Sequence, residues 1–168
     1  MVSNVVGGKK LTLALQALER KIVGRGDLRV GFLEGATYPA RTNARFLAAV
    51  GSKASPKVQP SMPIAQAAFW NEYGTTTAPS RPFFRTTIAT KSKEWGQKLS
   101  QALIASDYDG EAALRTLGQD VADDITRSIA EWDSPPNADL TQRIKGFDKP
   151  LIDSGDMQRA VDYEIVTK

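Results

Sequence analysis

Residues 114–132 constrain the fold of this chain more than any other segment, because they carry its longest helical pattern. Apolar residues recur there every three or four positions, which places them on one face of an α-helix. They are Leu114, Leu117, Val121, Ile125, Ile129 and Trp132. Residues 106–110 supply N-cap candidates before the pattern, and Pro135 and Pro136 stop it. We therefore expect a long amphipathic helix whose apolar face lies in a core.

Weaker patterns predict helices over residues 10–23, 61–73 and 82–105. The second is expected to begin at Ser61 as its N-cap and to end at Gly74, and the third to begin with Pro82 in its first turn. The apolar stripe of the first helix consists of Leu11, Leu15, Leu18 and Ile22. The apolar face of the third consists of Phe84, Ile88, Trp95, Leu99 and Leu103.

Two segments, residues 27–33 and 161–166, have the polar–apolar alternation that is typical of half-buried strands. Residues 133–149 are expected to form a loop, after which Asp153 or Ser154 caps a short helical turn. These elements predict one α+β domain over residues 1–168, with three or four helices packed on a small antiparallel β-sheet. Its core is expected to include Leu15, Leu18, Phe32, Ile88, Leu117, Val121, Ile125 and Val161.

The composition excludes several kinds of catalytic and metal site. The 168 residues include no cysteine and no histidine, so thiolate nucleophiles, thiolate-ligated zinc and the Ser-His-Asp triad are impossible. Asp120, Asp123 and Asp124 lie within about one turn of the long helix, but no other cluster of potential ligands accompanies them. We expect a solvated acidic face there, and predict no catalytic residue, metal site or cofactor. A carboxylate-based enzyme would need a concave pocket in which acids converge.

The net charge of +3 conceals segments of opposite sign. Residues 1–60 contain ten basic and three acidic side chains, whereas residues 106–139 contain two basic and nine acidic ones. This separation favours head-to-tail self-association or two different partners, although solvated faces that merely differ would give the same pattern. A basic loop insertion is expected at about residues 36–60, with a short helix around 43–50 as an alternative for part of it. Its cations are Arg41, Arg45, Lys53 and Lys57.

A nucleic-acid-binding module that uses the basic N-terminal portion is the alternative function. Phosphate contacts require clustered lysines and arginines, and base stacking requires interleaved aromatic residues. The basic residues of the loop are dispersed, and Tyr38 and Phe46 are its only aromatic residues. Nucleic-acid binding is therefore retained as the second interpretation.

Residues 64–85 are the most informative stretch. They read as a helix rich in small residues, a glycine stop, a polar loop and a second helix that begins at a proline. The side chains around this joint are Asn71, Glu72, Tyr73, Arg81 and Arg85. An ion pair between Glu72 and either Arg81 or Arg85 would fix the angle between the two helices. The stretch is either a structural corner without a partner or an ordered joint that contacts one.

The same stretch resembles a family of phage proteins. Asn71-Glu-Tyr-Gly-Thr75, followed by Pro79-Ser-Arg-Pro-Phe-Phe-Arg85, is similar to the tail-completion, or neck, proteins of long-tailed double-stranded DNA bacteriophages. Residues 149–161 resemble the family's C-terminal signature, with Ser154 where threonine is commoner, and Trp132-x-x-Pro-Pro-Asn137 also matches. The resemblance spans nearly the whole chain, but residues 41–59 depart from it and look like an insertion.

The resemblance implies a non-enzymatic virion protein at the head–tail junction, made in the cytoplasm of the bacterial host. Such proteins act as copies arranged in a ring, beside other neck, connector or tail-terminator proteins. The joint, the loop cations and the three aspartates are then candidates for protein contact, and the loop also for contact with passing DNA. The basic N-terminal portion of one copy would meet the acidic helix of the next. No membrane partner is expected, because no apolar run approaches the ~20 residues that a membrane helix needs.

Overall fold

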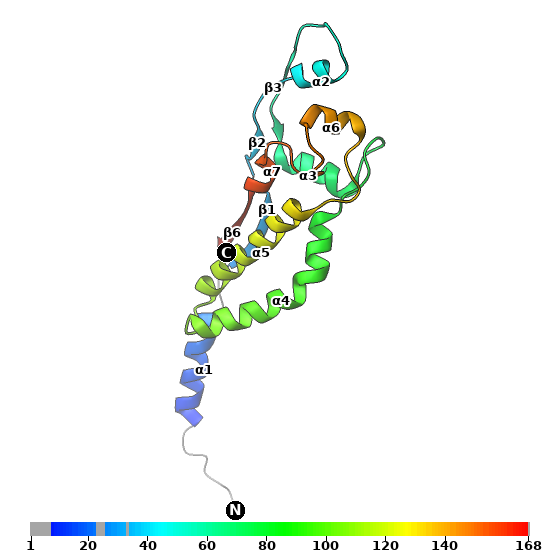
Figure 1. Ribbon diagram of the computed structural model, residues 1–168. Coiled ribbons are helices and arrows are strands. Elements are labelled where there is room, and N and C mark those ends of the chain that lie inside the picture. Colours follow the sequence, from blue (N-terminus) through cyan, green and yellow to red (C-terminus); the bar gives the residue numbers. More distant parts are fainter. Residues whose placement is uncertain (1–7, 23–25, 33, 168) are drawn as a thin grey trace, which may run out of the picture.

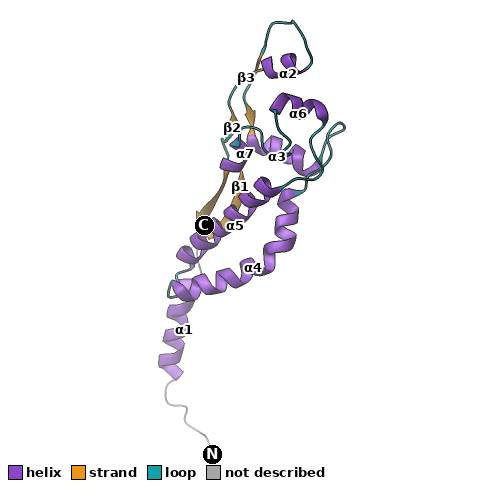
Figure 2. Ribbon diagram, viewed as in Figure 1, coloured by secondary structure: helices purple, strands orange, loops and turns teal. Residues whose placement is uncertain are grey.

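Helices make up most of the molecule, and short antiparallel strands complete it (Figure 2). The computed structural model describes residues 8–22, 26–32 and 34–167. The helices are α1 (Gly8–Ile22), α2 (Ala44–Ala49), α3 (Ile64–Tyr73), α4 (Phe83–Ala105), α5 (Gly110–Glu131), α6 (Asp139–Lys145) and α7 (Asp156–Arg159). The strands are β1 (Gly26–Phe32), β2 (Thr37–Tyr38), β3 (Arg41–Thr42), β4 (Val58–Gln59), β5 (Met62–Pro63) and β6 (Val161–Thr167). The α+β class is confirmed.

The longest strands, β1 and β6, come from opposite ends of the chain and pair antiparallel. Val30 lies opposite Tyr163 in this ladder. Asp27 and Arg29 are exposed on β1, whereas Leu28 and Val30 are partly buried, as the predicted alternation requires. Both predicted strands are therefore confirmed over the described residues, which do not include residue 33. They form the small sheet on which α5 packs.

The long predicted helix is α5, which packs against α4 and across the β1–β6 sheet (Figure 1). Its first turn is capped by Asp109, whose carboxylate accepts hydrogen bonds from the backbone N–H groups of Glu111 (3.0 Å) and Ala112 (3.1 Å). Helix α3 and residues near the C-terminus complete the core. The buried core cluster comprises Ile64, Ala68, Phe83, Val121, Ile125, Ile129, Leu151 and Met157, and Phe32, Leu117 and Val161 pack against it.

Helix α5 approaches the sheet closely at Gly118. A Cβ placed there would lie 2.4 Å from the Tyr163 ring and 2.9 Å from a methyl group of Leu28. We therefore expect Gly118→Ala to lower the free energy of unfolding by about 1 to 3 kcal/mol through overpacking, measured by urea denaturation. Gly96 of α4 is the matched control, because a Cβ there meets no described atom within 4 Å. Gly96→Ala should raise stability by about 0.5 to 1 kcal/mol, and equal effects of the two substitutions would contradict this packing.

Residues 36–63 form an arm that extends from the body (Figure 1). Strand β2 pairs with β5 and β3 with β4, both antiparallel. Helix α2 lies near the tip and confirms the short helix considered for residues 43–50. The strand pairs explain one error at the start of α3. Met62 and Pro63 pair with β2, so the helix begins at Ile64 after Pro63, and Ser61 is not its N-cap.

The region between α5 and β6 contains more helix than expected. Residues 133–149 are not a loop throughout, because α6 occupies Asp139–Lys145 and ends at Gly146, whose φ is 84°. The predicted short turn exists as α7, but Gly155 precedes it with a φ of 77° and no side chain caps it. The proposed caps Asp153 and Ser154 were therefore wrong. Among the described residues, no helix is both long and apolar enough to span a bilayer.

Helix α1 projects away from the body rather than packing on the sheet (Figure 1). Leu11 and Leu15 are 62% and 56% exposed, and Lys21 ties the helix to Asp107 through an exposed ion pair of 2.5 Å. The core assignment of Leu15 was therefore wrong, whereas Leu18, nearer the end of the same stripe, is partly buried. Ile88 is also wrongly assigned. It is 42% exposed, since α4 instead buries the side that carries Phe83 and Thr87.

Candidate functional site

Glu72 is the centre of the joint between α3 and α4. Its side chain is 7% exposed, and its carboxylate accepts hydrogen bonds from the backbone N–H groups of Phe84 (2.9 Å) and Arg85 (3.1 Å). These N–H groups lie in the first turn of α4 and have no partner within the helix. Arg85 Nε donates to the same carboxylate at 2.7 Å, and a second guanidinium nitrogen donates to the Glu72 carbonyl at 3.1 Å. The expected ion pair therefore forms with Arg85, and Glu72 also caps α4.

Arg81 connects the same joint to the loop after α5. Its guanidinium donates to the carbonyls of Pro135 (3.1 Å) and Pro136 (3.0 Å), and its backbone N–H donates to the carbonyl of Asn71. The side chain is buried, and this burial lowers the pKa of Arg81. Asn71 donates from its side chain to the Ala67 carbonyl at 2.8 Å. The structure thus brings together the residues that the sequence predicted for the joint. Most of their polar groups form hydrogen bonds within the chain.

An aromatic patch remains accessible on α3. We define it as Phe69, Trp70 and Tyr73, which are 59%, 42% and 55% exposed. The rings of Phe69 and Tyr73 lie 4.7 Å apart, and the Arg85 guanidinium lies 4.7 Å above the Tyr73 ring. Exposed Trp, Tyr and Arg side chains are the types that dominate binding energy in protein interfaces. The patch is therefore the part of the joint that a partner can reach.

The three aspartates of α5 do not form one solvated acidic face. Asp124 is 8% exposed and accepts a hydrogen bond from the indole N–H of Trp95 at 2.9 Å. Asp120 pairs with Lys98 of α4 at 3.4 Å. Asp123 is exposed and accepts a hydrogen bond from the Gln119 amide. The predicted solvent exposure was therefore wrong for Asp124. Trp95 of α4 covers this carboxylate and donates a hydrogen bond to it, and the spacing of residues along α5 alone does not reveal that neighbour.

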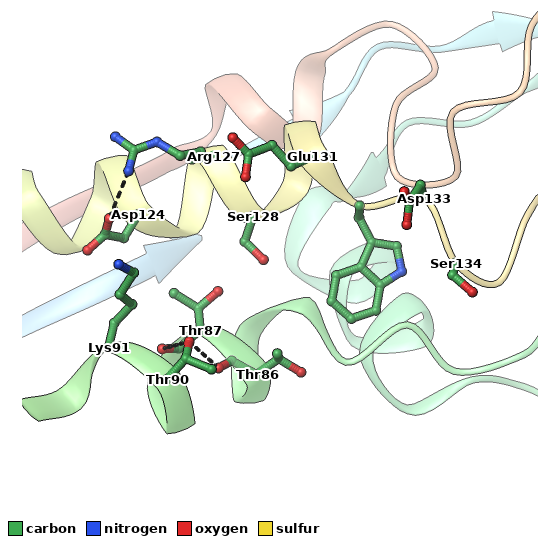
Figure 3. Close-up of a pocket in the computed structure, with 11 residues that line it drawn as sticks. Thr86, Thr87, Thr90, Lys91, Asp124, Arg127, Ser128, Glu131, Asp133 and Ser134 are labelled. Atoms are coloured by element: carbon green, nitrogen blue, oxygen red, sulfur yellow. Dashed lines mark hydrogen bonds and ion pairs between the residues drawn. The ribbon is translucent and has the colours of Figure 1, made fainter.

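A hollow of about 400 Å³ lies beside Asp124, between α4 and α5 (Figure 3). Thr86, Thr87 and Thr90 line it from α4, and the Thr87 and Thr90 hydroxyls donate to backbone carbonyls of their own helix. The Trp132 indole nitrogen at its edge is buried and has no hydrogen-bond partner among the described residues. The lining contains charges of both signs, from Lys91 and Arg127 and from Asp124, Glu131 and Asp133.

The arm cations fall into two groups. Arg41 pairs with Asp153 at 2.9 Å and with Asp156 at 2.8 Å, and Arg45 pairs with Asp153 at 3.4 Å. Lys53 and Lys57 are exposed near the tip. Hydrogen bonds from Ser154 and Arg159, together with the charges of Arg159 and Arg41, lower the pKa of Asp156. The two arginines thus tie the arm to the body instead of presenting free positive charge.

These ion pairs predict the effect of neutralising Arg41. We expect Arg41→Gln to lower the free energy of unfolding by only about 0.5 to 1 kcal/mol, because the pairs are partly exposed. Hydrogen exchange of the arm amides should accelerate, including that of the Asn43 N–H, which donates to the Lys57 carbonyl at 3.0 Å. Lys53→Gln on the same arm is the control and should leave these rates unchanged. Equal exchange rates in the two variants would show that the pairs do not anchor the arm.

Sequence reasoning missed the acidic half of this anchor. Asp153 and Asp156 were expected to belong to a capped turn, and their spacing was the one signal that could have drawn attention to them. It also missed Lys145, a side chain only 9% exposed, whose amine donates to the Lys149 carbonyl. No local pattern marks Lys145, because its burial depends on how α6 packs.

No group of three or more potential metal ligands lies together within residues 8–22, 26–32 and 34–167. Comparisons with models of protein families, with curated proteins and with solved structures found no match. What the protein does must therefore be inferred from its own residues and surfaces.

Proposed function

We propose that this chain is a structural protein of a phage head–tail junction, which helps to complete the tail or neck and joins it to the capsid. The residues that carry the resemblance to neck proteins support this proposal. Glu72, Arg81 and Arg85, which are separated along the motif, hold α3, α4 and the loop after α5 in one hydrogen-bonded joint. A motif of this kind suits a rigid scaffold that presents surfaces to neighbouring proteins.

The uncovered apolar face of α1 is the observation that carries the proposal. Leu11 and Leu15 share one face of the helix and are each more than half exposed. The aromatic patch of α3 is a second exposed apolar surface, and it lies away from α1 in the molecule (Figure 1). Distinct surfaces of this kind favour head-to-tail contacts, which close into a ring when the rotation between copies permits. We therefore propose a homo-oligomeric ring.

The charge separation supplies less of this association than the sequence suggests. Asp120 is paired with Lys98 and Asp124 is buried beside Trp95, so neither is a free charge for the next copy. Arg41 and Arg45 are likewise paired within the chain. Apolar contacts are therefore the main support for the ring, with charge as a secondary contribution. The same pairing weakens the case for nucleic-acid binding, and passing DNA remains at most a contact of Lys53 and Lys57 at the arm tip.

Complementation of a phage mutant tests the proposed function. A nonsense mutation in the gene for this chain should give particles in which filled heads and tails fail to join, visible by electron microscopy. Purified protein added to the mutant lysate should restore joined, infectious particles. Normal particles made without the protein would overturn the proposal.

A further inference from the structure

A second pocket, of about 420 Å³, lies where α3, α6, α7 and the base of the arm meet. Three buried polar side chains form part of its wall, namely Arg81, Asn137 and Lys145. Arginine and lysine are almost never this buried unless they are paired, because removing a charge from water is costly. The pocket wall therefore contains two cationic side chains that are buried to an unusual degree.

The hydrogen bonds of these cations go to backbone carbonyls rather than to carboxylates. Arg81 donates to two carbonyls of the loop after α5, and Lys145 donates to the Lys149 carbonyl. No described carboxylate forms an ion pair with either residue. Asp153 and Asp156 also line the pocket, but they pair with Arg41, and the Lys145 amine lies 5.0 Å from the centre of the Phe147 ring. Asp148 is nearby, but its carboxylate accepts from the backbone and side chain of Asn137 at 3.0 Å each. Burial lowers the pKa of both Arg81 and Lys145, which agrees with charges that lack a direct partner.

We propose that this pocket binds a carboxylate side chain from an acidic peptide segment of a partner protein. Arginine and lysine both form strong charge-assisted hydrogen bonds with carboxylates. Leu151, Ile152 and Met157 line the same pocket and can pack against the aliphatic stem of a glutamate. The pocket thus offers cations for the head of an acidic side chain and apolar surface for its stem.

The surroundings favour a peptide over a free anion. A larger hollow of about 820 Å³ lies between the arm and α3, and it shares Tyr38 and Asp153 with the pocket. The adjoining hollow provides room for a chain segment next to the bound carboxylate. That the partner is a neighbouring neck protein rests on the proposed function, whereas the carboxylate site itself does not.

Titration of the full chain with an acetylated, amidated tetraglutamate peptide tests the proposal. Lys145→Met keeps the aliphatic length and removes the charge, so it should weaken peptide binding at least about tenfold. Lys53→Met, at an exposed lysine of the arm, is the matched control and should change the affinity less than about twofold. Inorganic phosphate and a short DNA duplex, titrated separately, should bind more weakly than the peptide.

A second measurement uses the wild-type chain and does not depend on the folding of the variant. The pKa of the Lys145 amine, followed by NMR, should rise when the peptide binds, because a nearby carboxylate favours the ammonium form. Equal peptide affinity in the Lys145→Met and Lys53→Met variants, no detectable binding, or tighter binding of phosphate or DNA would each overturn the proposal. A chain that joins heads to tails but does not bind the peptide would refute this site alone. Peptide binding by a chain that is dispensable for joining would refute only the proposed function.

Discussion

Glu72→Ala is expected to lower the free energy of unfolding by about 3 kcal/mol. The substitution removes a carboxylate that satisfies two backbone N–H groups of α4 and the Arg85 guanidinium at once. Those N–H groups would remain in a partly buried joint with no acceptor, which costs more than the loss of an exposed contact. Urea denaturation followed by circular dichroism measures the change. Glu72→Gln should fall between the wild type and Glu72→Ala, because its amide oxygen can still accept from one donor.

Glu94, on the helix that Glu72 caps, provides the matched control. It pairs with Lys91 at 2.9 Å in an exposed i,i+3 contact, so Glu94→Ala should change stability by no more than about 0.5 kcal/mol. A loss in Glu72→Ala as small as in this control would mean that the joint does not depend on the buried carboxylate. The structural account of the motif would then be wrong.

Combining Leu11→Glu with Leu15→Glu should abolish self-association while leaving the monomer folded. Both leucines are more than half exposed, so the substitutions disturb no core of the monomer. A charge in an apolar interface costs roughly 2 kcal/mol or more per site, and two sites together weaken association at least about 100-fold. Sedimentation velocity measures the assembly, and circular dichroism checks the fold.

Gln16→Glu is the control for this double variant. Gln16 is exposed on the same helix but away from the leucine stripe, and its replacement also adds negative charge. It should leave the assembly state unchanged. Dissociation caused equally by Gln16→Glu would indicate that the basic charge of α1, rather than its leucine face, holds the copies together.

The parts of the fold that follow local periodicity could be predicted from sequence. The spacing of Val121, Ile125 and Ile129 identifies α5 and its buried face, and alternation identifies β1 and β6. The wrong predictions concern which element covers an apolar face. Leu15 has the spacing of a core residue, yet no described element lies over it, and helical spacing alone cannot say whether the covering partner belongs to the same chain.

The candidate site likewise contains contacts that local sequence predicts and contacts that it does not. An ion pair of Glu72 with either Arg81 or Arg85 was predicted because these residues flank one short loop, and the pair forms with Arg85. Asp124 was misjudged, since its indole partner Trp95 lies on another helix. The arm's ion pairs with Asp153 and Asp156, like the burial of Lys145, join segments far apart in sequence. Such contacts depend on tertiary packing, which composition and spacing do not encode.

The central claim, that this chain belongs to a phage head–tail junction, is tested most directly by a cryo-electron microscopy reconstruction of that junction in virions produced from the genome that carries its gene. The account predicts a ring at the junction into which the structure fits. In that ring the leucine face of α1 should be covered by a neighbouring copy. A junction with no density for this chain would contradict the proposed function, and a ring in which α1 remains uncovered would contradict the proposed basis of its assembly.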